Sequence, residues 1–129
     1  MAVGFPYTTG DVLTAADMNG LVAFSINAQT GTTYTAVSTD TYQVLVTMNN
    51  AAANNFKIPT NATTAFPVGT VLTVLQLGAG ATTISAVTSG TTTVTSAGAS
   101  SAAPVLAQYK SAACIKTGTD TWVVVGAIA

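Results

Sequence analysis

The stretch VLQLGAGATTIS, residues 74–85, places Gly78 and Gly80 directly after a strand-like run. Glycines in G-x-G spacing between a strand and a helix can hold a phosphate, because the backbone approaches it closely. A dinucleotide site also requires a third glycine, but Thr83 stands at that position, and the following TTISAV is rich in β-branched residues that favour a strand. The stretch therefore predicts a glycine-bearing loop between two antiparallel strands.

The titratable residues offer few alternatives for catalysis. The sequence contains four acidic residues, all Asp, together with three Lys, one Cys and no His. Without His, neither Ser-His-Asp nor Cys-His catalysis is available, and zinc loses its usual ligands. Asp11 and Asp17 flank the start of an expected helix, while Asp40 and Asp120 lie in the turn-like stretches STDT and TGTDT. We therefore expect no enzyme activity, no catalytic residue, no cofactor and no metal.

Cysteine and lysine chemistry is also limited. The single Cys114 cannot form a disulfide within the chain, and it lies in the strand-like AACIKT, where a small buried hydrophobe is the common role. A lysine can form an amide bond with an Asn side chain when an acid is buried beside them. The sequence has no recognisable signature for such a triad.

The composition restricts the classes of partner. Only 5 % of the residues are charged and the net charge is -1, so the chain has no basic patch for nucleic acid. The longest apolar run, Trp122 to Ala129, is far shorter than the roughly 20 residues of a spanning helix, so we expect no membrane insertion. The opening MAVGFPY does not resemble a signal peptide, and we expect use without export. With so few charges to cover its surface, the chain is expected to bury surface against copies of itself.

The N-terminal region has the pattern of a short helix. In DVLTAADMNGL, Thr14 is suited to the N-cap and Asp17 is the acid of a capping box. Leu13 and Met18 occupy the two positions of a hydrophobic staple. These signals predict a helix from Ala15 to about Phe24.

From about residue 30 the apolar period changes to two. In TYQVLVTM, one face holds the side chains of Tyr42, Val44, Val46 and Met48, as in a half-buried strand. VLTVLQL, residues 71–77, is apolar on both faces, which is typical of a strand buried on two sides, and we expect the second side to be a subunit interface. Further strand-like runs are FKIP, TTISAV, TTTVT, VLAQYK, AACIK and TWVVVGAI. Together they predict an all-β fold, an antiparallel sandwich or barrel-like domain.

One internal similarity stands out. TTYTAVSTDT, beginning at Thr32, and TTISAVTSGT, beginning at Thr82, align without gaps. They represent either two similar strand-turn-strand units or chance similarity in a chain rich in Thr, Ala and Ser. Neither the length nor the number of copies predicts a solenoid.

Several segments resemble structural proteins of tailed bacteriophages. FPYTTGDVLTAADMNGLV resembles the opening of small phage proteins in which GxVLTAAxxN precedes a β-rich region. INAQTGTTYT, FPVGTVLTVLQLGAGATTISA, LAQYKSAACIK and TDTWVVVGAI are similar to a module that recurs in phage tail, fibre and head-surface proteins. The resemblance extends from Phe5 to Ile128 and implies a non-enzymatic virion component, assembled in the host cytoplasm.

The resemblance also implies a β-rich homotrimer that binds its particle through one end. Residues 1–29 would be an anchoring segment and residues 30–129 the β-rich domain. Contacts to the major capsid protein or another virion protein are expected from Phe5, Tyr7, Leu13, Met18 and Leu21. The alternative is that this segment packs on its own domain.

Two locations on the virion remain open. The first is the capsid surface, as a decoration protein or short head fibre. The second is the tail, as a tail fibre or minor tail protein that binds a host surface glycan or receptor. Tyr34 or Trp122 facing solvent beside Asp40 or Asp120 would favour the second, although aromatic residues within apolar alternation are more often part of the core.

Overall fold

The computed structural model describes residues 10, 15, 23–41, 43–96 and 103–128, which contain ten strands and one 3-10 helix. In chain order these are β1 (Ser25–Gln29), β2 (Thr33–Thr35), η1 (Ser38–Asp40), β3 (Val44–Met48), β4 (Asn54–Ile58), β5 (Val71–Gln76), β6 (Thr82–Ala86), β7 (Thr93–Ser96), β8 (Val105–Leu106), β9 (Ser111–Gly118) and β10 (Thr121–Gly126).

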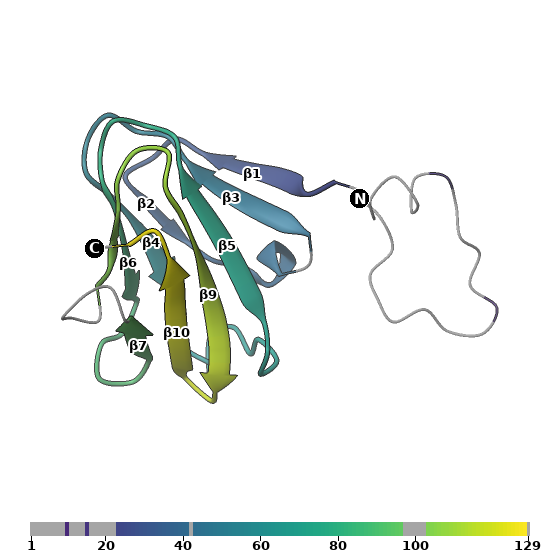
Figure 1. The fold of residues 1–129 in the computed structure, drawn as a ribbon. Helices are drawn as coiled ribbons and strands as arrows, with labels where there is room; N and C mark the ends of the chain where they lie inside the picture. The colour runs from purple at the N-terminus through teal and green to yellow at the C-terminus, as the bar shows by residue number, and fades with distance from the viewer. Residues whose placement is uncertain (1–9, 11–14, 16–22, 42, 97–102, 129) are drawn as a thin grey trace.

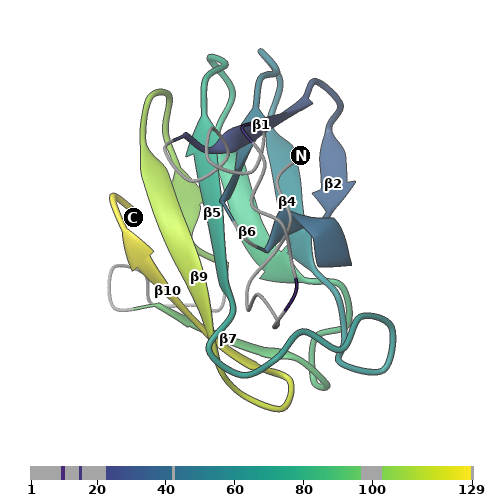
Figure 2. The same cartoon turned by 90° about the vertical axis from the view of Figure 1, so that its right-hand side faces the viewer.

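The strands form two sheets that enclose one core (Figure 1). The first, sheet A, has the order β1-β3-β5-β9-β10-β7, and the second, sheet B, has the order β2-β4-β6-β8. The turned view in Figure 2 shows β5 and β9 in one layer and β4 and β6 in the other. The expected all-β fold is confirmed, and of the two expected forms, a sandwich or a barrel-like domain, the two sheets correspond to the sandwich.

The chain crosses to the opposite sheet after each strand from β1 to β6. When the chain returns to a sheet, the new strand therefore runs parallel to the previous strand of that sheet. In sheet A, β1, β3 and β5 are parallel, and in sheet B, β2, β4 and β6 are parallel. This part of the chain, from β1 to β6, makes three turns of a flattened superhelix, which we call the coil. The expected antiparallel arrangement is wrong here, because strands that are consecutive in the sequence lie in different sheets and do not pair.

Antiparallel pairing is found at the C-terminal end. β9 and β10 form a hairpin, and β9 pairs antiparallel with β5. β10 in turn pairs with β7 in parallel, so the hairpin lies between β5 and β7 in sheet A (Figure 1). In sheet B, β8 runs antiparallel to β6.

The two similar sequence segments occupy corresponding places in the coil. β2 and β6 lie on opposite sides of β4, and Tyr34 and Ile84 both pair with Phe56. The gapless alignment from Thr32 and Thr82 therefore matches the register of sheet B. This agreement favours two similar structural units over chance.

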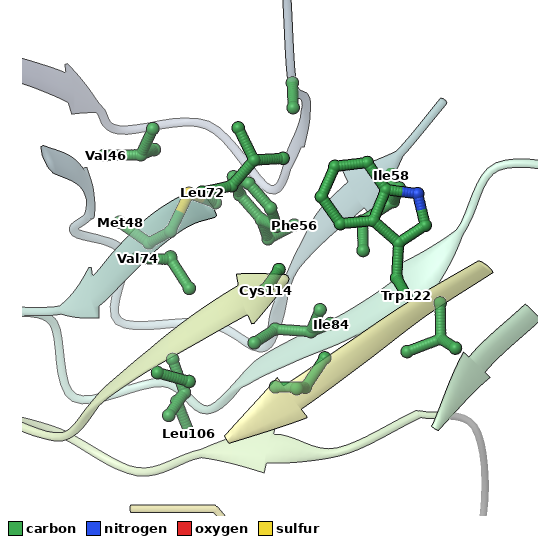
Figure 3. Packing of buried hydrophobic residues seen from close by; sticks show 14 of the residues in the cluster. Val46, Met48, Phe56, Ile58, Leu72, Val74, Ile84, Leu106, Cys114 and Trp122 are labelled. Atoms are coloured by element: carbon green, nitrogen blue, oxygen red, sulfur yellow. The ribbon is translucent and has the colours of Figure 1, made fainter. Parts of the chain in front are cut away.

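Alternate residues of the strands fill the core between the sheets. In β3, Val44, Val46 and Met48 are buried as predicted, whereas Tyr42 lies outside the described residues. Figure 3 shows side chains of both sheets pointing toward one another, among them Met48 and Leu72 of sheet A and Phe56 of sheet B. Burial of each large side chain contributes roughly 1.5–3 kcal/mol.

The expected N-terminal helix falls mostly outside the described residues. Ala23 and Phe24, at its expected end, are not helical. β1 begins directly after them, within the range expected to form the anchoring segment, and it belongs to sheet A.

Candidate functional site

The outer surface of sheet A is composed mainly of apolar side chains. They alternate along β1, β3, β5, β9 and β10 with the side chains that fill the core. Three of them are strongly exposed, Ile26 at 60 %, Val125 at 44 % and Val71 at 42 %. We call this surface the apolar face, and it comprises Ile26, Leu45, Val71, Leu75, Ile115, Val123 and Val125.

The register of sheet A arranges the apolar face in rows. Val71 lies opposite Ile115, which in turn lies opposite Val123. A second row begins with Ile26 and Leu45 and ends with Val125. The two-sided apolar pattern of β5 is therefore real, but its outer side is only partly covered by the described chain, with Val71 exposed. The sequence-based expectation of a subunit interface on that side stays a prediction.

The outer surface of sheet B is mainly polar, although Val105 of β8, which pairs with Thr83, lies on the same side. Its rows follow the pairing of β2 with β4 and of β4 with β6. Hydroxyl, amide and ammonium groups on this surface can hydrogen-bond to water. We call it the polar face, and it comprises Thr33, Thr35, Asn55, Lys57, Thr83 and Ser85.

A network of polar side chains closes the core beside the edge strands β1 and β2. Asp40 is only 2 % exposed. Its carboxylate accepts hydrogen bonds from Asn27 Nδ2 at 2.8 Å, Tyr34 Oη at 2.6 Å and the Val37 backbone N–H at 2.9 Å. Burial, and then the hydrogen bond to Asp40, raise the pKa of Tyr34 to about 12. The phenol therefore stays protonated and serves as a donor.

A second buried polar group lies at the β9–β10 end of the molecule. Lys116 is 2 % exposed, and its Nζ donates to Asn61 Oδ1 and to the Phe66 carbonyl oxygen, each at 2.6 Å. Asp120 Oδ1 accepts from the Asn61 backbone N–H at 2.6 Å and from Thr92 Oγ1 at 3.0 Å. The sequence analysis did not identify this group, because its members lie in β9 and in three separate connections between strands.

The two glycines of VLQLGAGATTIS have a structural role. A Cβ at Gly78 would lie 2.4 Å from the backbone of Asn50, and one at Gly80 would lie 2.0 Å from the Ala52 carbonyl oxygen. The Gly80 N–H donates to the Asn50 carbonyl oxygen at 3.0 Å. Glycine is required here because successive crossings between the sheets stack backbone on backbone. The loop joins β5 in sheet A to β6 in sheet B, so the expected antiparallel pairing of its flanking strands is wrong.

Gln76, which is buried, holds this crossing from the inside. Its Nε2 donates to the Gly80 carbonyl oxygen, and its Oε1 accepts from the Gly78 N–H at 2.9 Å. The backbone groups that a phosphate-binding loop would direct at a ligand are thus engaged within the chain. This observation supports the structural interpretation of the G-x-G spacing.

The remaining candidate residues lie as follows. Trp122 is 1 % exposed and contacts Phe66 edge to face, with ring centroids 5.6 Å apart, so it belongs to the core. Cys114 is fully buried, and burial raises its pKa to about 12. Both observations agree with the sequence analysis. The predicted docking residues Phe5, Tyr7, Leu13, Met18 and Leu21 lie outside the described residues.

Asp40 and Asp120 belong to the two different polar groups described above. In the part of the chain that the structure describes, no group of three or more His, Cys, Asp or Glu side chains could hold a metal ion. The described residues also include no helix that is long and apolar enough to cross a membrane. The apolar face is therefore the strongest candidate for a functional surface.

No protein family matches the chain, and neither a curated protein nor a solved structure is significantly similar to it.

Proposed function

We propose that the protein is a non-enzymatic virion structural protein of a tailed bacteriophage, a capsid decoration protein or short head fibre that acts as a homotrimer. The observation that carries this proposal is the apolar face. Parallel strands are normally covered on both sides of their sheet, whereas Ile26 and Val71 are exposed on the outer side of the parallel strands β1 and β5. Val125 of the antiparallel strand β10 is exposed on the same side of sheet A. In the trimer, the three apolar faces pack together and the polar faces remain in water.

Binding to the particle follows from mass action. A protein that binds the assembled shell better than free subunits adds its binding free energy to assembly. Apolar contact contributes about 25 cal/mol per Å² of buried surface. Since only 5 % of the residues are charged, both trimer formation and docking depend weakly on salt.

The N-terminal segment is the proposed docking element, as its resemblance to phage proteins implies. β1 follows this segment directly and forms one edge of sheet A. We expect Leu13→Asp and Met18→Asp to abolish incorporation into particles, because each places a charge in an apolar contact. Both variants should still form the β-rich trimer. Full occupancy of these variants on particles would show that the docking assignment is wrong.

The alternative is a tail fibre or minor tail protein with a receptor-binding role. Tyr34 lies beside Asp40, as this alternative requires, but its hydroxyl is already used in the polar network. Trp122 is buried and therefore cannot stack on a sugar. Tyr34 and Trp122 therefore give the alternative no support, whereas Tyr109 is 73 % exposed and could contact a sugar.

Cryo-electron microscopy of the particle that carries the chain tests the proposal directly. Density arrayed over the capsid lattice is the expected result. Density confined to the tail would replace decoration with the alternative. Absence of the chain from purified particles would overturn the proposal altogether.

A further inference from the structure

Lys116 has an unusual environment for a lysine. Its side chain is almost fully buried, and its Nζ donates to two amide oxygens, Asn61 Oδ1 and the Phe66 carbonyl oxygen, each at 2.6 Å. Lysine is rarely buried to this extent unless it is paired with a counter-charge. Neutral oxygens compensate an ammonium group less well than a carboxylate does.

The surroundings of Lys116 bury its side chain and hold its partner in place. Trp122 lies opposite Lys116 in the β9–β10 register, and Phe66 packs edge to face against Trp122. Asn61 is fixed from the other side, because its backbone N–H donates to Asp120 Oδ1 at 2.6 Å. The amine of Lys116 is therefore buried against the carboxamide of a half-buried Asn61, and a half-buried Asp120 holds the Asn61 backbone.

We propose that Lys116 and Asn61 react to form an intramolecular amide bond. Nζ, after losing a proton, attacks Cγ of Asn61, and a new Nζ–Cγ bond forms. A proton then passes from Nζ of the adduct to the original amide nitrogen, and the bond between this nitrogen and Cγ breaks. The nitrogen leaves as ammonia, which takes up the proton that Lys116 released at the start. The overall change converts one ammonium and one carboxamide into one secondary amide and one ammonium ion, so no other reactant is required.

Asp120 is a positioning residue in this proposal. It contacts Asn61 only through the backbone N–H, and it also accepts a hydrogen bond from Thr92 Oγ1 at 3.0 Å. We expect its negative charge to act on the amine of Lys116 from a distance, because the hydrogen bonds of Lys116 Nζ go to Asn61 and Phe66 and those of Asp120 go to Asn61 and Thr92. It thereby holds Asn61 close to the amine without touching the reacting atoms.

The bond would link two distant parts of the chain. Asn61 lies in the connection between β4 and β5, and Lys116 lies in β9. The cross-link would therefore tie the C-terminal hairpin to the coil. This inference does not depend on the proposed virion role, since it concerns only the chemistry within one chain.

Mass spectrometry of the purified wild-type protein tests the proposal. The intact mass should be lower than the sequence mass by one molecule of ammonia. Trypsin cleaves after lysine, and an amide at Lys116 blocks cleavage there, so the digest should contain Ile58–Lys110 joined to Ser111–Ala129. A wild-type protein of full mass, with Ser111–Lys116 released as a free peptide, would overturn the proposal.

Matched variants identify the reacting groups. Lys116→Arg keeps a cation that can donate to both oxygens but cannot form the amide, so it should retain the full mass. Asn61→Asp should lose water in place of ammonia if the site reacts. Loss of ammonia from Lys116→Arg would place the bond elsewhere and so contradict the assignment.

The role of Asp120 has its own readout. Asp120→Asn preserves an oxygen that accepts from the Asn61 N–H but removes the charge, and it should lower the fraction of cross-linked protein. Asp120→Glu should restore part of that fraction. Equal cross-linking in the wild type and Asp120→Asn would show that the charge of Asp120 is not needed.

Discussion

The outer surfaces of the two sheets differ although both sheets are built by the same coil. Sheet A presents the apolar face, in which Val71 and Ile26 are exposed, and sheet B presents Thr, Ser, Asn and Lys side chains. Inside, the same strands contribute apolar residues from both sheets to one core. Folding alone requires only the inner alternation, so the difference between the outer faces indicates a requirement beyond the fold.

The largest effect on stability is expected in the connection between β5 and β6, which crosses from sheet A to sheet B. Gly80→Ala places a methyl group against the Ala52 carbonyl oxygen, so two stacked crossings must separate. We expect a loss of roughly 3 kcal/mol or more in the free energy of unfolding, measured by urea denaturation.

Gly31→Ala is the matched control for this change. Its new Cβ would meet no atom closer than 4.0 Å, and its effect should stay within about 0.5 kcal/mol. If the two variants are equally stable, the backbone stacking of the crossings does not determine stability.

Introducing one charge on the apolar face and one on the polar face tests whether the two outer faces differ in subunit association. Val71→Asp introduces a carboxylate into the apolar face, and burying it in a subunit contact without a partner is strongly unfavourable. We expect trimer association, measured by sedimentation equilibrium, to weaken by roughly 100-fold or more, which corresponds to about 2.7 kcal/mol.

Thr83→Asp places the same charge on the polar face and should leave association unchanged. Circular dichroism should show a folded β protein for both variants. Equal weakening by the two substitutions, or a wild type that is monomeric, would remove the functional distinction between the faces.

The smallest effect concerns the polar network at the open edge of the coil. The folded-state pKa of Tyr34 is about 12, above its ordinary value of 10.0, so its contribution to stability is fully present below pH 10. The contribution is lost as the pH rises from 10 through about 12, because the unfolded chain releases the tyrosine proton near pH 10 while the folded state still holds it.

Thermal melts between pH 9 and pH 12 check this expectation. The wild type should lose stability more steeply than Tyr34→Phe, which lacks the ionisable hydroxyl. Cys114 has a pKa raised in the same direction and is present in both proteins, so the difference between them isolates Tyr34. Parallel curves for the two proteins would show that the Tyr34 hydroxyl does not contribute.

The sequence predicted which side chains are buried better than it predicted which strands pair with each other. Alternation placed Val44, Val46 and Met48 in the core, and the setting of Cys114 indicated burial, because a strand's inner face can be read from the period of two. The period of two does not indicate which strand pairs with which in a sheet. The sequence analysis therefore did not predict the parallel coil. The alignment of the segments at Thr32 and Thr82 nevertheless matches the register in which β2 and β6 pair with β4.

The candidate sites show the same limit. VLTVLQL indicated an apolar outer side on β5, which the structure extends over neighbouring strands of sheet A. Lys116 and Asn61 gave no signal, because their proximity depends on how the β4–β5 connection folds back over the hairpin. The predicted contacts Leu13 and Met18 remain predictions.

The position of the C-terminal hairpin affects how the protein is made. β9 and β10 follow β5 and β7 in the chain, yet they lie between these two strands in sheet A. Until they are synthesised, β5 and β7 have open edges that can pair with other chains. Sheet A is thus completed only after β10 has been synthesised, and a chain truncated before β9 lacks the middle of the sheet, not its margin.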